Sequence, residues 1–207
     1  MERNIKLKNK ISRIKLLGFK NLFLCLSQRF VLNLFRFFYN FDPWHSRSSF
    51  FCRPYKKVVV EISNSLKPNS VIEIGCGLGE IISRIKAPLK YGIDIEDKVI
   101  KAAKILNPKV RYFKGDLKTV LQIPEINIHL LIMVNFLHGI PPEKLKKELN
   151  FILERKKIKY ILADRYYKTY KTDGYRHNLE KLTNKIKKIK SYDDQEGTRE
   201  LILYEVL

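Results

Sequence analysis

The chain has 207 residues, of which 45% are hydrophobic and 12% aromatic, and it carries a net charge of +20 at pH 7. This length suits one well-buried domain with an appendage and is too short for two full domains, and the composition excludes a disordered chain. The charge favours anionic partners such as nucleic acid, lipid headgroups or phosphorylated metabolites, although lysine spread over a solvated surface would give a similar balance.

The N-terminal stretch combines positive charge with large apolar side chains. Residues 1–60 hold 13 Lys and Arg against 2 Asp and Glu. Apolar residues at roughly helical spacing predict one or two helices with a broad apolar face: Ile11, Ile14, Leu17, Leu22, Leu26, Phe30, Leu34 and Phe37. Recurring charges argue against a bilayer span and a signal peptide. We expect this face to pack on its own domain or on a partner subunit; the alternative is peripheral contact of residues 1–38 with a membrane interface.

The next stretch, residues 39–55, is irregular and dense in aromatic side chains, with Pro43 and Pro54 as breakers. A helix is predicted over residues 55–67, followed by a turn at Pro68. Beyond the turn, strands alternate with helices. Strands are predicted at 70–75, 90–94, 110–113, 128–134 and 158–164, and helices at 79–86, 97–106 and 142–155. This alternation predicts a mostly parallel sheet with helices on both faces.

The chain closes with two stretches of alternating pattern, residues 184–194 and 198–207, joined by Gln-Glu-Gly. Such a pair predicts an antiparallel hairpin. A hairpin is an uncommon addition to a parallel sheet.

The stretch VIEIGCGLGE, residues 71–80, places a glycine at every second position directly after a predicted buried strand. Glycine lets the chain turn sharply and lets a ligand approach the main chain, and before a helix N-terminus such a turn suits a nucleotide-like ligand. A dinucleotide site requires a small residue three positions after Gly77, where this chain has Glu80, and a P-loop requires Gly-Lys-Ser/Thr. The sequence matches neither the dinucleotide pattern nor the P-loop pattern. It has E-x-G-x-G-x-G instead, from Glu73 to Gly79.

With this motif the sequence resembles the class I S-adenosylmethionine-dependent methyltransferases. Three further stretches agree: YGIDIEDKVIKAAK, VRYFKGDLKTV and IHLLIMVNFLHGIPPEKLKKEL resemble the second, third and fourth motifs of that family. The family's terminal antiparallel strands account for the hairpin. The resemblance covers residues 55–207 and implies a Rossmann-like three-layer α/β sandwich with a seven-stranded, mostly parallel sheet, preceded by an N-terminal helical extension at residues 1–54.

The resemblance also implies S-adenosylmethionine as cofactor. Asp94 would accept the ribose hydroxyls, Asp116 would meet the adenine amino group, and Leu117 would pack on the adenine ring. The expected cofactor contacts are Glu73, Gly75, Cys76, Gly77, Gly79, Asp94, Ile95, Asp116, Leu117 and Asn135. The acidic residues also have simpler interpretations, as a strand-end charge, a helix N-cap and a turn residue.

Methyl transfer from a sulfonium mainly requires an aligned nucleophile, and a base only when the acceptor is protonated. Asn135 and His138 follow the fourth strand, where ligands bind in such sheets, and are the catalytic candidates. His138 would serve as a general base for an alcohol, or else pack as a structural residue. The loop lacks the Asn/Asp-Pro-Pro-aromatic pattern of adenine-methylating relatives, which argues against DNA-adenine methylation.

Two basic and aromatic stretches, residues 39–55 and 164–177, are predicted to wall one acceptor pocket; the alternative is interface or solvated surface. The candidate acceptor contacts are Trp44, His45, Arg53, Tyr55 and Tyr166. These side chains favour a small-molecule, sugar or lipid-linked glycan acceptor, methylated at oxygen or nitrogen. RNA methylation is the second hypothesis, because of the charge and the interleaved tyrosines, and a cofactor-binding scaffold without activity is the third.

The three cysteines, Cys25, Cys52 and Cys76, are too few and too scattered for a disulfide framework, and no CxxC pair indicates zinc. We therefore expect no metal and a reducing, cytoplasmic compartment, with the inner membrane face as the alternative location.

Overall fold

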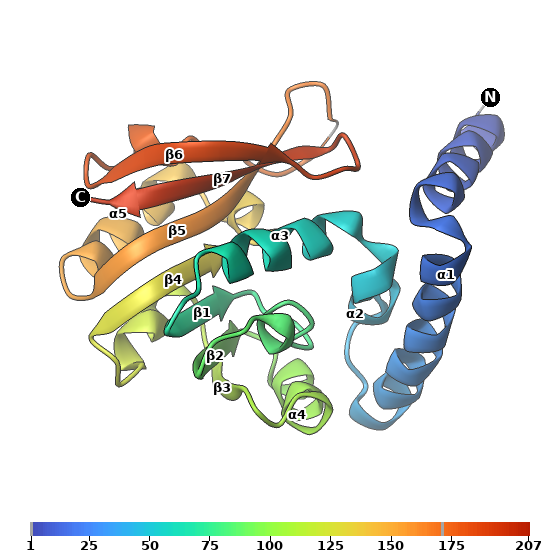
Figure 1. The fold of residues 1–207 in the computed structure, drawn as a ribbon, viewed down its shortest axis with the longest axis horizontal. Helices are drawn as coiled ribbons and strands as arrows, with labels where there is room; N and C mark the ends of the chain where they lie inside the picture. The colour runs from blue at the N-terminus through green and yellow to red at the C-terminus, as the bar shows by residue number, and fades with distance from the viewer. Residues whose placement is uncertain (1, 171) are drawn as a thin grey trace.

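The computed structural model describes the backbone of residues 2–170 and 172–207, and the side chains from residue 21 onward apart from residue 171. A seven-stranded sheet runs through the molecule in the order β3-β2-β1-β4-β5-β7-β6 (Figure 1). Its strands are β1 (Ser70–Ile74), β2 (Leu89–Asp94), β3 (Arg111–Lys114), β4 (Asn127–Met133), β5 (Lys157–Tyr166), β6 (Ile186–Asp193) and β7 (Arg199–Val206). The pairings of β7 with β5 and β6 are antiparallel and the others are parallel. All the predicted strands and the closing hairpin are confirmed.

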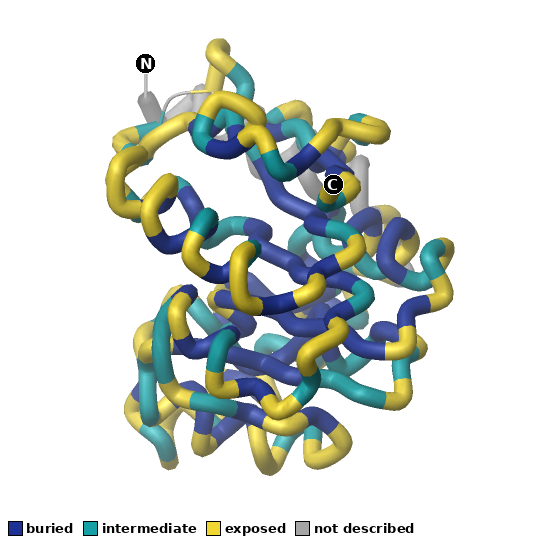
Figure 2. The backbone as a smooth tube through the Cα atoms, turned by 90° about the vertical axis from the view of Figure 1, so that its left-hand side faces the viewer, coloured by how far each residue is buried: buried dark blue, intermediate teal, exposed yellow. Residues whose placement is uncertain are grey.

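Helices cover both faces of the sheet, because the central strands are apolar on both sides. Val71 of β1 packs with α3 (Pro54–Ser65) and α4 (Asp97–Leu106). Ile72, the next residue, faces the other side and packs with α5 (Pro142–Leu153). Figure 2 shows the buried strands between the more exposed helices and loops. The expected Rossmann-like three-layer sandwich is confirmed.

The helix predicted at residues 79–86 does not form, and this expectation was wrong. After the glycine turn the chain makes only a short 3₁₀ turn, η2 (Ile82–Arg84). Three β-branched isoleucines stand in this segment, and Pro88 disfavours the helical region for the residue before it. The buried Glu73 carboxylate accepts the Ile82 N–H at 2.9 Å and thereby satisfies a donor that a longer helix would use.

Residues 2–39 are helical on both sides of a break at Gly18, in agreement with the prediction of one or two helices. Helix α1 (Glu2–Tyr39) contains Gly18 at φ 70° and ψ 164°, which divides it into two helices. The side chains of Ile11, Ile14 and Leu17 lie outside the described residues. Further along, Leu32 packs in a small cluster with Leu78 of the glycine loop and with α4. One side of α1 therefore packs on the chain's own domain.

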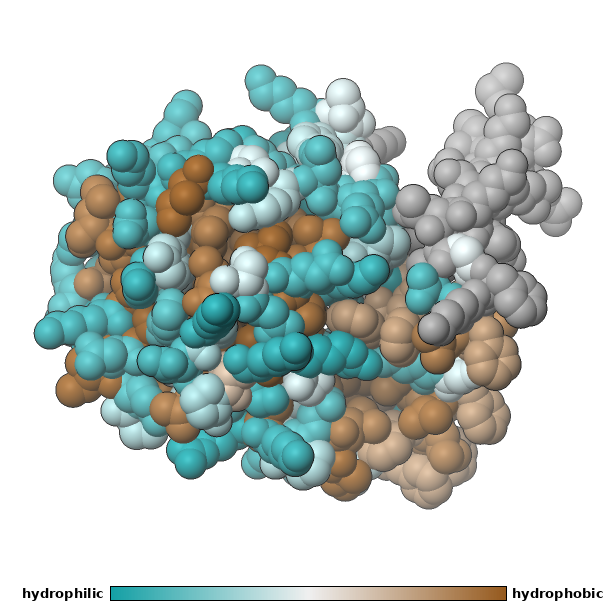
Figure 3. Space-filling model, viewed as in Figure 1, coloured by the Kyte–Doolittle hydropathy of each residue, from teal (hydrophilic) through white to brown (hydrophobic). Residues whose placement is uncertain are grey.

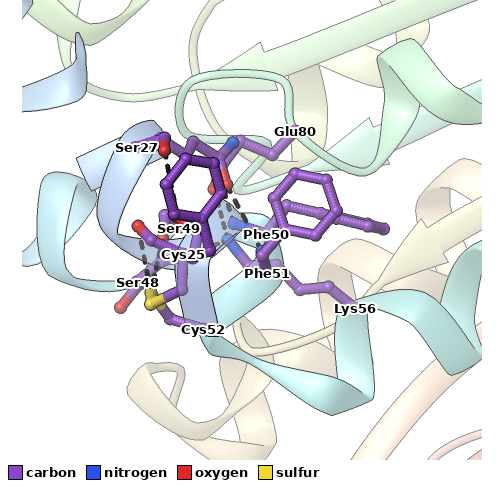
Figure 4. The surroundings of a disulfide bond; sticks show 11 residues. Cys25, Ser27, Ser48, Ser49, Phe50, Phe51, Cys52, Lys56 and Glu80 are labelled. Atoms are coloured by element: carbon purple, nitrogen blue, oxygen red, sulfur yellow. Dashed lines mark hydrogen bonds and ion pairs between the residues drawn. A yellow bond between two sulfur atoms is a disulfide. The ribbon is translucent and has the colours of Figure 1, made fainter. Parts of the chain in front are cut away.

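A disulfide joins Cys25 of α1 to Cys52, 27 residues further on (Figure 4). The expectation that the cysteines are too few and too scattered for a disulfide framework overlooked this single pair. After α1 the chain turns back through α2 (Pro43–Arg47) and the 3₁₀ turn η1 (Phe50–Cys52), which brings the two Cα atoms to 5.1 Å. Cys76 is a buried free thiol. The cysteine argument for a reducing compartment therefore fails for this pair, and the cytoplasmic location stays a prediction without that support.

By length and composition, α1 also contains a segment that could cross a membrane. This segment is Asn21–Tyr39, with 19 residues of which 11% are buried. The expectation that charges exclude every such window was therefore too strict. Core helices of soluble proteins and signal sequences pass the same test, so the position of α1 on the domain has to decide what this segment does.

Candidate active site

A cleft with a cavity of about 290 Å³ lies at the carboxyl ends of the central strands. In parallel sheets this edge is where ligands bind. Of the predicted site residues, the cleft brings together Trp44, His45, Tyr55, Glu73, Gly75, Cys76, Gly77, Asp94, Ile95, Asp116 and Asn135. The predicted residues Arg53, Gly79, Leu117, His138 and Tyr166 do not line it. The carboxyl ends of β1, β2 and β3 thus each contribute a carboxylate to one cavity.

The glycine loop needs its glycines for both conformation and space. Gly75 and Gly79 have φ angles of 68° and 76°, a left-handed region that side chains rarely adopt. A Cβ at Gly75 would come within 3.0 Å of the Phe136 ring, and one at Gly79 would overlap the Tyr112 hydroxyl. The bare backbone lets the loop after β1 approach β3 and the loop after β4.

Asp94 ends β2 and connects the glycine loop to the start of α4. Its Oδ2 accepts the Gly77 N–H at 2.8 Å, and its Oδ1 accepts the Glu96 N–H at 3.1 Å. Each carboxylate oxygen can accept a second hydrogen bond. The Asp94 carboxylate can therefore fix the loop and still accept a pair of hydroxyl groups from the cleft.

Glu73 lies beneath the glycine loop with 3% of its surface exposed. Burial raises the pKa of Glu73 from its usual value of 4.5 to about 8, against the Ile82 N–H and the nearby Lys56 ammonium, which both lower it. A carboxyl group of this kind is held largely protonated at neutral pH. A cation bound beside it would favour the ionised form.

Asp116 lines the cleft and also caps η3 (Leu117–Gln122), where it accepts the Lys118 N–H at 3.0 Å. The capping interpretation and a ligand contact are thus compatible. Leu117 has no exposed surface and packs in the core with β1 and β2. The expectation that its side chain packs on a bound ring was wrong, because the turn after Asp116 directs this side chain into the interior.

Asn135, directly beyond β4, is held by a buried polar network. It adopts φ 59°, and its N–H donates to Asp164 Oδ1 at 2.9 Å. Its amide oxygen accepts from Arg199 at 2.9 Å and from the Tyr166 hydroxyl at 3.2 Å. Arg199 also pairs with Asp164 at 2.7 Å. Because the amide oxygen already accepts two hydrogen bonds, the NH₂ group of Asn135 is the part of the side chain that can donate to a ligand.

His138 lies behind this network, in η4 (Leu137–Gly139). Its ring packs edge-on against Tyr166 with 5.6 Å between centroids, and its Nδ1 is buried without a hydrogen-bond partner among the described residues. Burial lowers the pKa of His138 from 6.5. The catalytic role of His138 stays a prediction. Its side chain contacts Tyr166, which in turn bonds to the cleft residue Asn135, and does not itself line the cleft.

The predicted acceptor contacts divide into two groups. Trp44, His45 and Tyr55 line the cleft, and His45 Nε2 lies within hydrogen-bond distance, 3.2 Å, of Oε1 of Glu96, which also lines it. Arg53 stacks over the Trp44 ring at 5.1 Å, and the Tyr166 hydroxyl donates to Asn135. These two residues therefore contact cleft residues without lining the cleft themselves.

Two cleft residues that the sequence analysis did not select hold the N-terminal segment in place. Glu80 Oε1 accepts from Gln28 of α1 at 2.7 Å and from the Phe50 N–H at 2.9 Å, and Oε2 pairs with Lys56 at 2.6 Å (Figure 4). The only sequence signal for this role was the charge of Glu80 where a dinucleotide site requires a small residue. Lys56 gave no signal.

No protein-family model and no curated protein sequence matches this chain. Its structure, however, matches many solved ones. The N-methyltransferase NodS from Bradyrhizobium japonicum WM9, in complex with S-adenosylhomocysteine, matches with a TM-score of 0.63 and 14% identity over 80% of this chain and 92% of that chain. Magnesium protoporphyrin IX methyltransferase from Synechocystis PCC 6803, with bound S-adenosylmethionine, matches with a TM-score of 0.57 and 14% identity over 74% and 80%. An S-adenosylmethionine-dependent methyltransferase from Clostridium acetobutylicum ATCC 824 matches with a TM-score of 0.59 and 13% identity over 74% and 91%.

Proposed function

Given a chain with the fold of the class I S-adenosylmethionine-dependent methyltransferases, we propose that it binds S-adenosylmethionine and methylates a small-molecule, sugar or lipid-linked glycan acceptor at oxygen or nitrogen. The observation that carries this proposal is the convergence of Glu73, Asp94 and Asp116 on one cleft beside the glycine loop. The solved structures with this fold and a bound cofactor support it.

The residues present fit this cofactor chemically. The buried Glu73, whose pKa is raised by burial, is a group that an ammonium would stabilise in its ionised form. Asp94 would accept the ribose hydroxyls, and Asp116 the adenine amino group. When bound, the cofactor would supply an electrophilic methyl group on a sulfonium, and the neutral thioether would be the leaving group.

The chain's own contribution is to orient the acceptor and to exclude water. The Asn135 NH₂ group would donate to the acceptor, and its direction is fixed by Arg199 and Tyr166. Trp44 and Tyr55 supply an aromatic wall of the kind that packs on sugars and rings. The pair between His45 and Glu96 would cover the cleft. Such positioning accounts for much of the rate of an in-line displacement.

RNA is the second candidate acceptor. The net charge of +20 and the stacked rings of Tyr166 and Tyr170, with centroids 5.1 Å apart, favour it. The described residues contain no appended RNA-binding module in this fold, so this candidate rests on charge and stacking alone.

Calorimetry and a methylation assay test the proposal in two steps. The protein should bind S-adenosylhomocysteine, and labelled S-adenosylmethionine should transfer its methyl group to a small-molecule or lipid fraction of a cell extract. Transfer to the RNA fraction would favour the second candidate. Binding without transfer to any fraction would favour a scaffold, and no binding would overturn the proposal.

A further inference from the structure

The side of α1 that points away from the domain is largely apolar, with Ser27 among the apolar side chains and its hydroxyl donating back to the Phe23 carbonyl at 3.0 Å. This outer face consists of Phe23, Leu26, Phe30, Val31, Leu34, Phe37 and Phe38. Phe30 and Phe37 are 75% and 81% exposed, values typical of charged surface side chains. Figure 3 shows apolar side chains gathered over α1 at the lower right. Exposed apolar surfaces of this extent mark contact sites with a partner or a membrane.

The opposite side of the same helix is fixed to the domain. Leu32 is 3% exposed, Gln28 bonds to Glu80 at 2.7 Å, and Cys25 is covalently joined to Cys52. A helix that crosses a bilayer is surrounded by lipid or by other spanning elements. Since α1 packs one side along the α/β domain, the geometry is that of a helix lying parallel to a surface.

We propose that the outer face of α1 docks in the interfacial layer of an anionic lipid bilayer, with the helix parallel to the membrane plane. The positive charge of the N-terminal segment favours an anionic bilayer over a second copy of this chain. Residues 1–40 contain nine Lys and Arg and one Glu, so a second copy docked on the same face would bring two strongly positive segments together. An anionic lipid surface attracts such a segment.

Arg29 and Arg36 lie on the flank of α1, between its outer face and the side that packs on the domain. Arg29 and Arg36 precede Phe30 and Phe37 in the sequence and are therefore rotated by about 100° from them around the helix axis. With the phenylalanines inserted, the arginine stems would lie along the interface and their guanidinium groups would reach the lipid phosphates. Helix α2 contacts α1 and carries Trp44 and His45 of the cleft. Docking would thus place the cleft near the bilayer, where a lipid-linked acceptor would be met.

Flotation of the full-length protein with vesicles tests this docking. Wild type should bind phosphatidylcholine vesicles that contain phosphatidylglycerol and bind pure phosphatidylcholine vesicles weakly. The double variant Phe30→Asp/Phe37→Asp should lose at least about tenfold in vesicle affinity. The control Ile189→Asp replaces a side chain on β6 that is 50% exposed and should bind as wild type does.

Equal binding of the double variant and wild type would overturn the proposal. The proposal would also be overturned if wild type bound no vesicles and formed a dimer in sedimentation that the double substitution dissociates. The docking does not depend on the proposed function, and S-adenosylhomocysteine binding measured on the same variants separates the two. The double variant should retain that binding, which also shows that it is folded.

Discussion

Asp94 accepts the N–H of Gly77 at 2.8 Å, so the carboxylate expected to hold a ribose also fixes the loop expected to hold the amino-acid end of the same ligand. One residue thus serves two halves of one site. Replacing it should disturb both.

Asp94→Asn should weaken S-adenosylhomocysteine binding by about 10- to 100-fold, because the amide retains one acceptor oxygen and turns its NH₂ towards a backbone donor or a hydroxyl. Calorimetry measures the dissociation constant. Asp97→Asn is the matched control: it changes the same charge three residues away on the exposed start of α4, where Asp97 pairs with Lys101. Unchanged affinity in Asp94→Asn would contradict the proposed ribose contact.

Glu73 should make the stability of the ligand-free protein depend on pH. Its pKa is raised from 4.5 to about 8 in the folded state, so the folded protein holds this proton more tightly than the unfolded chain does. The stabilisation is therefore complete below about pH 4.5 and is lost as the pH rises towards 8, a change on the order of a few kcal/mol.

Urea denaturation between pH 5 and 8.5 measures this effect, and Glu73→Gln should flatten the pH dependence (on the order of one proton of linkage). Glu61→Gln on α3, which replaces an exposed carboxylate, should retain it. Cofactor binding at neutral pH should release a proton, because a bound ammonium lowers the pKa of Glu73. The same slope in wild type and Glu73→Gln would show that Glu73 is already ionised.

The disulfide should contribute to stability through the loop that it closes. A covalent loop spanning 27 residues lowers the entropy of the unfolded chain and is worth about 3 kcal/mol. Cys25→Ser/Cys52→Ser should lower the free energy of unfolding by that order. Reducing agent should bring wild type to the level of the double variant and leave the double variant unchanged. A wild type insensitive to reductant would contradict the pairing.

The buried pair of Arg199 and Asp164 should behave as a coupled unit. The two residues are 5% and 8% exposed and lie 2.7 Å apart. Arg199→Met leaves a buried carboxylate without its cation and should cost about 3–5 kcal/mol, and adding Asp164→Asn should recover part of that loss. The pair of Arg165 and Glu200, also at 2.7 Å but more exposed, is the control, and Arg165→Met should cost about 1 kcal/mol or less. Additive costs in the first cycle would show that the two residues are not coupled.

The centre of the sheet was predictable because β1 and β4 are largely apolar runs, and the closing hairpin because its two strands alternate apolar and polar residues. Val71 and Ile74 belong to a strand buried on both sides, which the sequence shows directly. The convergence of Asp94 and Asp116 was predictable as well, since both follow parallel strands and such strands end at one edge.

The features that the sequence analysis missed depend on contacts between distant segments. The Cys25–Cys52 bond requires the chain to turn back along α1, and no local pattern encodes that return. The absence of a helix at residues 79–86 depends on Glu73, which lies six residues before that segment. Its carboxylate accepts the Ile82 N–H. The Leu117 side chain points into the core and not at the cleft, because the direction of a turn residue follows from packing rather than from spacing.

Glu80 connects the N-terminal segment to the glycine loop. The residue is 6% exposed, and its carboxylate bonds to Gln28, Phe50 and Lys56. Removing α1 would take away the Gln28 contact and uncover this buried ion pair directly after Gly79, so it should disturb ligand binding and lipid binding together. A truncated protein could then fail every assay for reasons unrelated to membranes, and only surface substitutions on an intact chain can tell the two activities apart.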